Sequence, residues 1–172
     1  MNRPQYILQP VNPYFISFSL AAAFLLNLMT WGRLAGVPDF VALVLLFWNV
    51  HQPRKVGMGI AFVFGLLVDV DNGALFGQHA LAYTLLSYGA ITLHRRIRWF
   101  PLMSQCIYVF ALLQIAQLAS AAVRLWVGGS SAPTWWLGLF SGVLGAVVWP
   151  FLHSLLLAPQ RRPAKRDDTR PL

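Results

Sequence analysis

Long apolar stretches separated by short polar connectors run along the whole chain of 172 residues. A helix that crosses a bilayer needs roughly 20 apolar residues at about 1.5 Å per residue, and each stretch approaches that length. The pattern therefore predicts an all-α polytopic integral membrane protein, with about six transmembrane helices in one domain spanning residues 1–172. The predicted helices run approximately over Tyr14–Trp31, Leu34–Val50, Val56–Val70, Ala74–Leu93, Pro101–Val127 and Trp135–Leu157.

Two of these helices, the second and the third, are short for a hydrocarbon core of about 30 Å. They must extend into their flanks, lie in locally thinned bilayer, or pack inside the bundle. The connector after the third helix, Asp69-Val70-Asp71-Asn72-Gly73, is rich in turn-forming residues. It predicts either a tight loop or a partly re-entrant turn, and an even number of crossings is compatible with both.

Composition supports the membrane interpretation. Hydrophobic residues make up 58% of the chain and charged residues only 10%, whereas a soluble domain carries about 25% charged residues. The chain has a single cysteine, Cys106, which excludes an internal disulfide and a thiolate metal cluster. The amino-terminal segment has no short apolar core followed by a small-residue cleavage site, so we expect the first helix to remain as an anchor.

The basic residues predict the orientation. Eleven of the 13 lie at the amino end, in two alternate connectors or in the tail, and these segments face the cytoplasm when residues 1–13 do. The net charge of +8 is then a topology signal rather than a nucleic-acid footprint. Residues 160–172 hold five basic residues and two prolines, which predicts a disordered cytoplasmic tail. The seven tryptophans fall mostly near predicted helix ends, as interfacial residues do.

Small residues recur at every fourth position through the third predicted helix and the following turn. The positions are Gly57, Ala61, Gly65, Asp69, Gly73 and Gly77. Such a face allows a second helix to approach closely, and ordinary close packing beside a loop explains it. A sharper hypothesis makes Asp69 a buried anchor for a backbone turn or for a cation on a partner, because acids within membranes are costly.

The run from Phe64 to Leu81 resembles the central signature of the rod shape-determining protein MreD family. That signature has a Gly-Leu-x-x-Asp pattern, two further glycines, a polar residue and an apolar run. The positions that carry the resemblance are Gly65, Asp69, Gly73, Gly77 and His79.

The resemblance implies a non-catalytic inner-membrane subunit of the bacterial cell-elongation complex. The basic residues, as described above, predict that both termini lie in the cytoplasm, and we expect no cofactor. The resemblance implies direct binding to the bitopic protein MreC, and a wider complex with the filament protein MreB, the polymerase RodA and a class B penicillin-binding protein. It also implies a fold similar to the substrate-binding subunits of vitamin transporters.

The fifth predicted helix has a polar edge along its length, because Gln114, Gln117 and Arg124 share one face. Amides need partners in hydrocarbon, so this edge either joins helices within the chain or docks a partner. Arg124 could pair with Asp69 or Asp71, because all three are expected near the outer surface.

Two further helix faces can be interpreted either as packing surfaces or as functional sites. His79, Tyr83 and Ser87 share one face of the fourth helix, and without a second ligand at metal-binding spacing we expect His79 to be a packing residue rather than a metal ligand. Small residues on the sixth helix favour internal packing over self-association, and they are Gly138, Gly142 and Ala146.

The sequence leaves one alternative function open and disfavours another. A small-molecule binding or transport subunit is the alternative, because compact helices with a few inward polar groups suit a ligand. An intramembrane hydrolase fits poorly, because a di-aspartyl site needs acids on two facing helices and Asp69 and Asp71 are only two residues apart. We therefore expect no catalytic residues.

Overall fold

The computed structural model describes residues 6–8, 12–29, 36–73, 77–127 and 135–163, and within them the chain forms six α-helices. The number of helices predicted from the apolar pattern is confirmed for these residues. Their bounds are α1 Pro13–Leu28, α2 Phe40–His51, α3 Met58–Asn72, α4 Gln78–Trp99, α5 Leu102–Trp126 and α6 Trp135–Leu157. A 3₁₀ turn, η1 Ala158–Gln160, and two short strands, β1 Tyr6–Leu8 and β2 Arg161–Pro163, complete the described elements.

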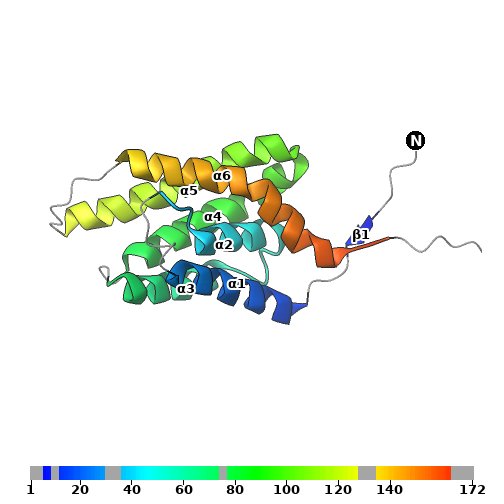
Figure 1. Cartoon of the computed structure of the whole chain (residues 1–172), viewed down its shortest axis with the longest axis horizontal. Helices are drawn as coiled ribbons and strands as arrows, with labels where there is room; N and C mark the ends of the chain where they lie inside the picture. The colour runs from blue at the N-terminus through cyan, green and yellow to red at the C-terminus, as the bar shows by residue number, and fades with distance from the viewer. Residues whose placement is uncertain (1–5, 9–11, 30–35, 74–76, 128–134, 164–172) are drawn as a thin grey trace, which may run out of the picture.

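Successive helices run in opposite directions along the long axis of the molecule (Figure 1). The starts of α1, α3 and α5 therefore lie at one end of the bundle, together with the ends of α2, α4 and α6. The starts of α2, α4 and α6 lie at the other end. This up-and-down arrangement needs only short connectors, as expected for neighbouring antiparallel helices.

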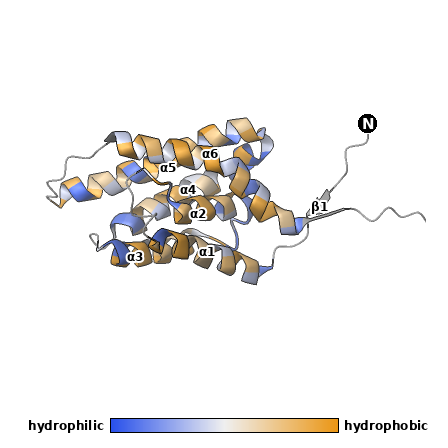
Figure 2. Ribbon diagram, viewed as in Figure 1, coloured by the Kyte–Doolittle hydropathy of each residue, from blue (hydrophilic) through white to orange (hydrophobic). Residues whose placement is uncertain are grey.

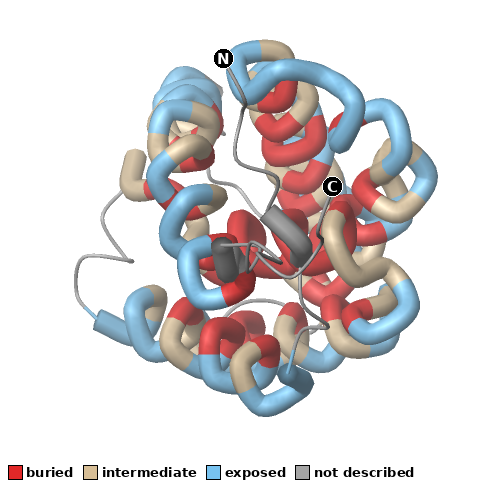
Figure 3. Tube along the Cα trace, turned by 90° about the vertical axis from the view of Figure 1, so that its right-hand side faces the viewer, coloured by how far each residue is buried: buried red, intermediate tan, exposed pale blue. Residues whose placement is uncertain are grey.

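Helix α2 lies at the centre of the bundle. All ten residues of Val41–Val50 are buried, and the helix packs against α1, α4 and α6. In Figure 3, seen along the bundle, buried positions face the middle and exposed positions face outward. A helix that is apolar on every side belongs inside a larger structure, so packing inside the bundle explains why this predicted helix is short.

The outer surface of the bundle is strongly apolar, as the ribbon coloured by hydropathy shows (Figure 2). Large apolar side chains on several helices are exposed, among them Phe18, Ile107, Leu118 and Phe151. Among the described residues, two segments are long and apolar enough to cross a membrane, residues 102–126 and 136–160. Helices α1 and α2 are apolar but shorter. These features are consistent with a membrane protein.

The two ends of the described chain meet. Strands β1 and β2 pair antiparallel, with Ile7 opposite Arg162, so the amino- and carboxyl-terminal segments lie side by side. The predicted disordered tail begins differently from expectation: Gln160 is buried and its side chain donates to the Leu156 carbonyl at 3.1 Å. Backbone pairing with β1 gives Arg161–Pro163 an ordered partner that composition alone does not reveal. Residues 164–172 of the predicted tail lie outside the described residues.

The tryptophan side chains that the structure describes are either exposed or completely buried. Trp99 and Trp126 are 91% and 90% exposed at helix ends, as interfacial residues are. Trp48 and Trp149 are completely buried, so the interfacial interpretation is wrong for them. Each buried indole has a hydrogen-bond acceptor, which lets it serve as core: Trp48 donates to the Ser19 hydroxyl at 2.8 Å, and Trp149 donates to a glutamine side-chain oxygen on α5 at 3.3 Å.

Candidate functional site at the α3–α4 turn

Asp69 lies in the last turn of α3, which ends at Gly73 in the left-handed conformation (φ 57°). Glycine adopts this conformation without steric cost, and it is the usual residue where a helix stops in this way. The backbone N–H of Gly73 donates to the carbonyls of Asp69 and Val70. The Asp69 side chain has no exposed surface, so the carboxylate is buried at the end of the helix.

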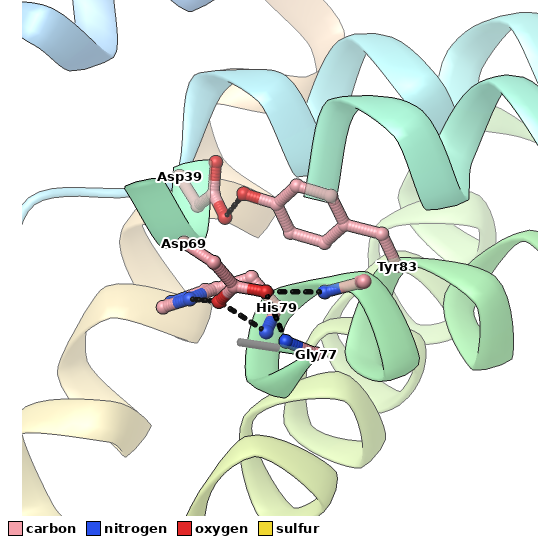
Figure 4. Close-up of polar contacts among 6 residues, drawn as sticks. Asp39, Asp69, Gly77, His79 and Tyr83 are labelled. Atoms are coloured by element: carbon pink, nitrogen blue, oxygen red, sulfur yellow. Dashed lines mark hydrogen bonds and ion pairs between the residues drawn. The ribbon is translucent and has the colours of Figure 1, made fainter. Parts of the chain in front are cut away.

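The Asp69 carboxylate binds the start of α4 (Figure 4). One oxygen, Oδ2, accepts from the backbone N–H of Gly77 at 2.9 Å and from that of Ala80 at 3.3 Å. The other, Oδ1, accepts from the backbone N–H of His79 at 2.8 Å. The first N–H groups of a helix have no partner within the helix, and a negative charge there is favoured by the helix dipole. Asp69 thus caps α4 from the preceding helix. This geometry agrees with the hypothesis that Asp69 is a buried anchor for a backbone turn.

His79 completes this network through its side chain. Its Nδ1 lies 2.8 Å from Asp69 Oδ1, and because the carboxylate can only accept, Nδ1 carries the proton in this contact. The ring of His79 also lies near the Tyr83 ring, with centroids 6.1 Å apart. Within the described residues, no group of three or more His, Cys, Asp or Glu side chains is placed to hold a metal ion.

The close approach of α3 and α4 depends on Gly65. A Cβ at this position would lie 2.3 Å from Ala80 Cα and 2.7 Å from the His79 carbonyl oxygen, so no larger residue fits without moving a backbone. Ala61 is also fully buried on this face. The predicted small-residue face is therefore real at Ala61 and Gly65, but it does not extend to Gly57, where an added Cβ would meet nothing within 4 Å.

A second acid, the partly buried Asp39, was not identified as a site residue from the sequence. It caps α2, since its Oδ1 accepts from the Ala42 N–H at 3.1 Å. The same oxygen accepts from the Asn27 side chain of α1 at 2.8 Å, and Oδ2 accepts from the Tyr83 hydroxyl of α4 (Figure 4). An acid immediately before an apolar run is a recognisable helix-start signal. The links to Asn27 and Tyr83 join residues far apart in the chain, and no local pattern predicts them.

Both acids bind helix α4: Asp69 accepts from the His79 N–H in its first turn, and Asp39 accepts from the Tyr83 hydroxyl one turn further on. Both carboxylates lie at the end of the bundle opposite β1 and β2. Their oxygens accept from backbone N–H groups and contact the side chains of Asn27, His79 and Tyr83, so the arrangement ties α1, α2, α3 and α4 together. Its chemistry is that of a structural clamp.

The polar residues of α5 face α6. Gln114 donates to the Gly138 carbonyl at 3.3 Å. An added Cβ at Gly142 would lie 2.0 Å from Gln114 Nε2, and one at Gly138 would lie 2.5 Å from Gln117 Oε1. The glutamines thus fill the space that the α6 glycines leave. The polar edge of α5 therefore joins two helices within the chain, and the small-residue face of α6 is used for internal packing.

Arg124 lies apart from this packing. It is exposed in the last turn of α5, at the same end of the bundle as Asp69. The contacts of the Asp69 carboxylate are with α4, so the predicted ion pair between Arg124 and Asp69 is not formed. The reason is local: the first turn of α4 offers several backbone donors next to Asp69, and they satisfy the carboxylate.

A family model described as rod shape-determining protein MreD matches residues 9–158 of this chain. The chain belongs to the MreD family. The matched region includes all six helices and the whole Asp69 network. MreD membership makes the chain a rod shape-determining protein of the cell-elongation machinery, and the two apolar segments in α5 and α6 agree with a membrane protein.

Among curated proteins, the chain is 28% identical over 146 residues to the rod shape-determining protein MreD of Haemophilus influenzae, covering 81% of this chain and 86% of that protein. No solved structure matches the chain, so the expected likeness to vitamin-transporter subunits receives no support from comparison of structures.

Proposed function

We propose that this MreD-family protein is a non-catalytic, multi-pass subunit of the rod complex in the bacterial inner membrane. It binds MreC directly, and through the wider complex it works with MreB, RodA and a class B penicillin-binding protein to support peptidoglycan synthesis during elongation. The observation that carries the proposal is the family match over residues 9–158.

The proposed topology has six crossings with both termini in the cytoplasm. The antiparallel order of the helices and the pairing of β1 with β2 support an even number of crossings. The basic residues of the α2–α3 connector and of the end of α4 lie at the same end of the bundle as β1 and β2. A concentration of basic residues at one end is typical of a cytoplasmic face.

A structural role agrees with the contacts of Asp69, which is buried, and of Asp39, which is partly buried. Asp69 and Asp39 each accept hydrogen bonds on both oxygens, so both carboxylates are committed to holding helices together. In this proposal Gly65, Asp69, Gly73, Gly77 and His79 shape the α3–α4 turn at the outer end of the bundle.

The other partner-interaction candidates act in different ways. Gln114 and Gln117 hold α5 against α6, so they affect a partner only through the position of these helices. Arg124 is exposed at the outer end of α5, and it is the candidate that can contact the extracytoplasmic part of MreC directly.

Depletion of the protein in its rod-shaped host tests the function. We expect rounded, swollen cells and loss of MreC from pull-downs with the remaining elongation proteins, and re-expression of the wild-type chain restores both. The Arg124→Ala variant is expected to weaken MreC capture without changing membrane levels of the protein. Unchanged shape combined with lost uptake of a vitamin would refute the adaptor role and favour the transport-subunit alternative.

Cysteine labelling tests the topology. In a Cys106→Ser background, one cysteine is introduced at Ser130 and, in a second variant, at Arg166. A membrane-impermeant maleimide added to intact spheroplasts is expected to label position 130 and to reach position 166 only after lysis. Labelling of both positions in intact spheroplasts would contradict the even number of crossings.

A further inference from the structure

A groove of about 760 Å³ opens between α1 and α3 at the end of the bundle that carries the termini. Its lining includes Ile16, Ser17 and Leu20 of α1, Gly59 and Val63 of α3, and Lys55 of the preceding connector. The described contacts in this groove do not belong to the Asp69 clamp, which lies at the opposite end of the same helices.

The groove exists because α1 and α3 meet at one end and leave space at the other. Towards the Asp69 end, the rings of Phe24 and Phe64 pack edge to face with centroids 6.3 Å apart. Towards the termini, Gly59 has no side chain, and a Cβ built there would meet nothing within 4 Å. The space is therefore open at its surface and floored by buried Ile16 and Leu20.

The described lining combines an apolar trough with a basic residue, Lys55, at its end. Lys55 is exposed where the chain enters α3, and Arg54 precedes it. An apolar trough that ends in a cation is complementary to an amphiphile with a long apolar chain and an anionic head group. Basic sites between transmembrane helices on the cytoplasmic side bind anionic lipid head groups.

We propose that the α1–α3 groove binds one anionic phospholipid of the cytoplasmic leaflet, with an acyl chain along Gly59 and Val63 and the phosphate at Lys55. A lipid fits better than a second protein helix, because a partner helix lying in hydrocarbon would place apolar residues against Lys55. The inference rests on the membrane placement in the proposed function. It adds a lipid to the elements that hold α1 against the rest of the bundle.

Photo-crosslinking tests the site on the full chain in lipid vesicles. The vesicles are phosphatidylcholine with a small fraction of either phosphatidylglycerol or phosphatidylcholine that carries a diazirine in its acyl chain. We expect label on α1 and α3 in the groove, about five-fold stronger with the anionic probe, the preference that one lysine near a charged surface provides.

Four variants separate the groove from its surroundings. Lys55→Gln is expected to remove the preference for phosphatidylglycerol, and its matched control Arg54→Gln, one residue outside the groove, is expected to keep it. Gly59→Leu is expected to lower groove labelling by both probes, because the side chain fills the trough. Gly57→Leu is the matched control, since a side chain there also meets nothing within 4 Å but lies outside the lining.

The outcomes are distinguishable. Equal labelling by both probes, or equal loss in Lys55→Gln and Arg54→Gln, would overturn the lipid site. Groove label that disappears when purified MreC is reconstituted with the chain would assign the groove to a protein helix and overturn it as well. Vesicle flotation and MreC capture are read on the same samples, so a chain that floats and captures MreC without lipid preference refutes the lipid site alone, whereas a chain that does not float refutes the membrane placement.

Discussion

Removing the Asp69 carboxylate is expected to destabilise the bundle more than any other single polar change at its outer end. The carboxylate accepts from three backbone N–H groups at 2.8, 2.9 and 3.3 Å and contacts the His79 ring at 2.8 Å, and it has no exposed surface. Asp69→Ala leaves all of these donors without their acceptor. Asp69→Asn keeps one acceptor oxygen but turns a donor amide towards the other N–H groups.

The size of the effect follows from these contacts. Loss of a helix cap costs about 0.5–2 kcal/mol, and each buried donor left without a partner costs about 1–3 kcal/mol. Water can reach part of the turn, because Gly73 is exposed beside it. We therefore expect about 3 kcal/mol of lost stability for Asp69→Ala, at the low end of the summed costs. For Asp69→Asn we expect about half of that.

The assay is unfolding of the purified protein in mixed micelles with increasing sodium dodecyl sulfate, followed by circular dichroism and by tryptophan fluorescence. Arg124→Ala is the control, because this exposed residue lies at the same end of the bundle. The double variant Asp69→Ala/Arg124→Ala is expected to show additive effects within about 0.5 kcal/mol, since the two side chains are not paired. An Asp69→Ala protein as stable as wild type would refute the capping role, and strong coupling to Arg124 would restore the ion pair.

Further predictions concern the helix contacts. Gly65→Ala is expected to destabilise the protein by about 1–3 kcal/mol, because its Cβ would collide with α4 backbone, whereas Gly59→Ala, with open space around it, is expected to be neutral or slightly stabilising; the same detergent titration compares them. Tyr83→Phe removes the hydroxyl that donates to Asp39 and is expected to cost about 1.5–3 kcal/mol, the range for a hydrogen bond to a charged group; a smaller loss than 0.5 kcal/mol would show that the contact does not hold α4 to α2. Gln114→Leu removes the donor to an α6 carbonyl, and a branched side chain replaces the amide against the α6 glycines; faster protease cleavage in the α5–α6 connector is expected, and an unchanged cleavage rate would contradict the helix-joining role.

Much of the architecture could be predicted because hydrophobic length and turn residues are local signals. The apolar runs of α5 and α6 and the turn-forming residues that end at Gly73 predicted helix positions close to those observed. The Asp69 motif was also visible, because Gly65, Asp69 and Gly77 recur at a spacing that suits one close contact and one turn. The geometry then showed that the carboxylate binds backbone donors and the His79 ring at the start of α4.

Other features could not be predicted from any local pattern. The burial of α2 and of Trp149 depends on which helices surround them, and an apolar helix facing lipid has the same composition as one facing protein. The link between Asp39 and Tyr83 joins residues 44 positions apart. The pairing of β1 with β2 joins the two ends of the described chain, where composition indicated only a solvated tail.

The sequence by itself determined the helix number, the preference for apolar surroundings and the concentration of basic residues that predicts orientation, because these depend on composition and short-range spacing. Only the tertiary structure decided which apolar helix lies inside, which acid caps which helix, and which glycines serve as contact points. Those outcomes depend on distances between segments remote in the chain. The turn after Asp69 depends on both the sequence and the tertiary structure. Its residue types predict a turn, and the close packing of α4 against Gly65 brings backbone donors of α4 to the Asp69 carboxylate.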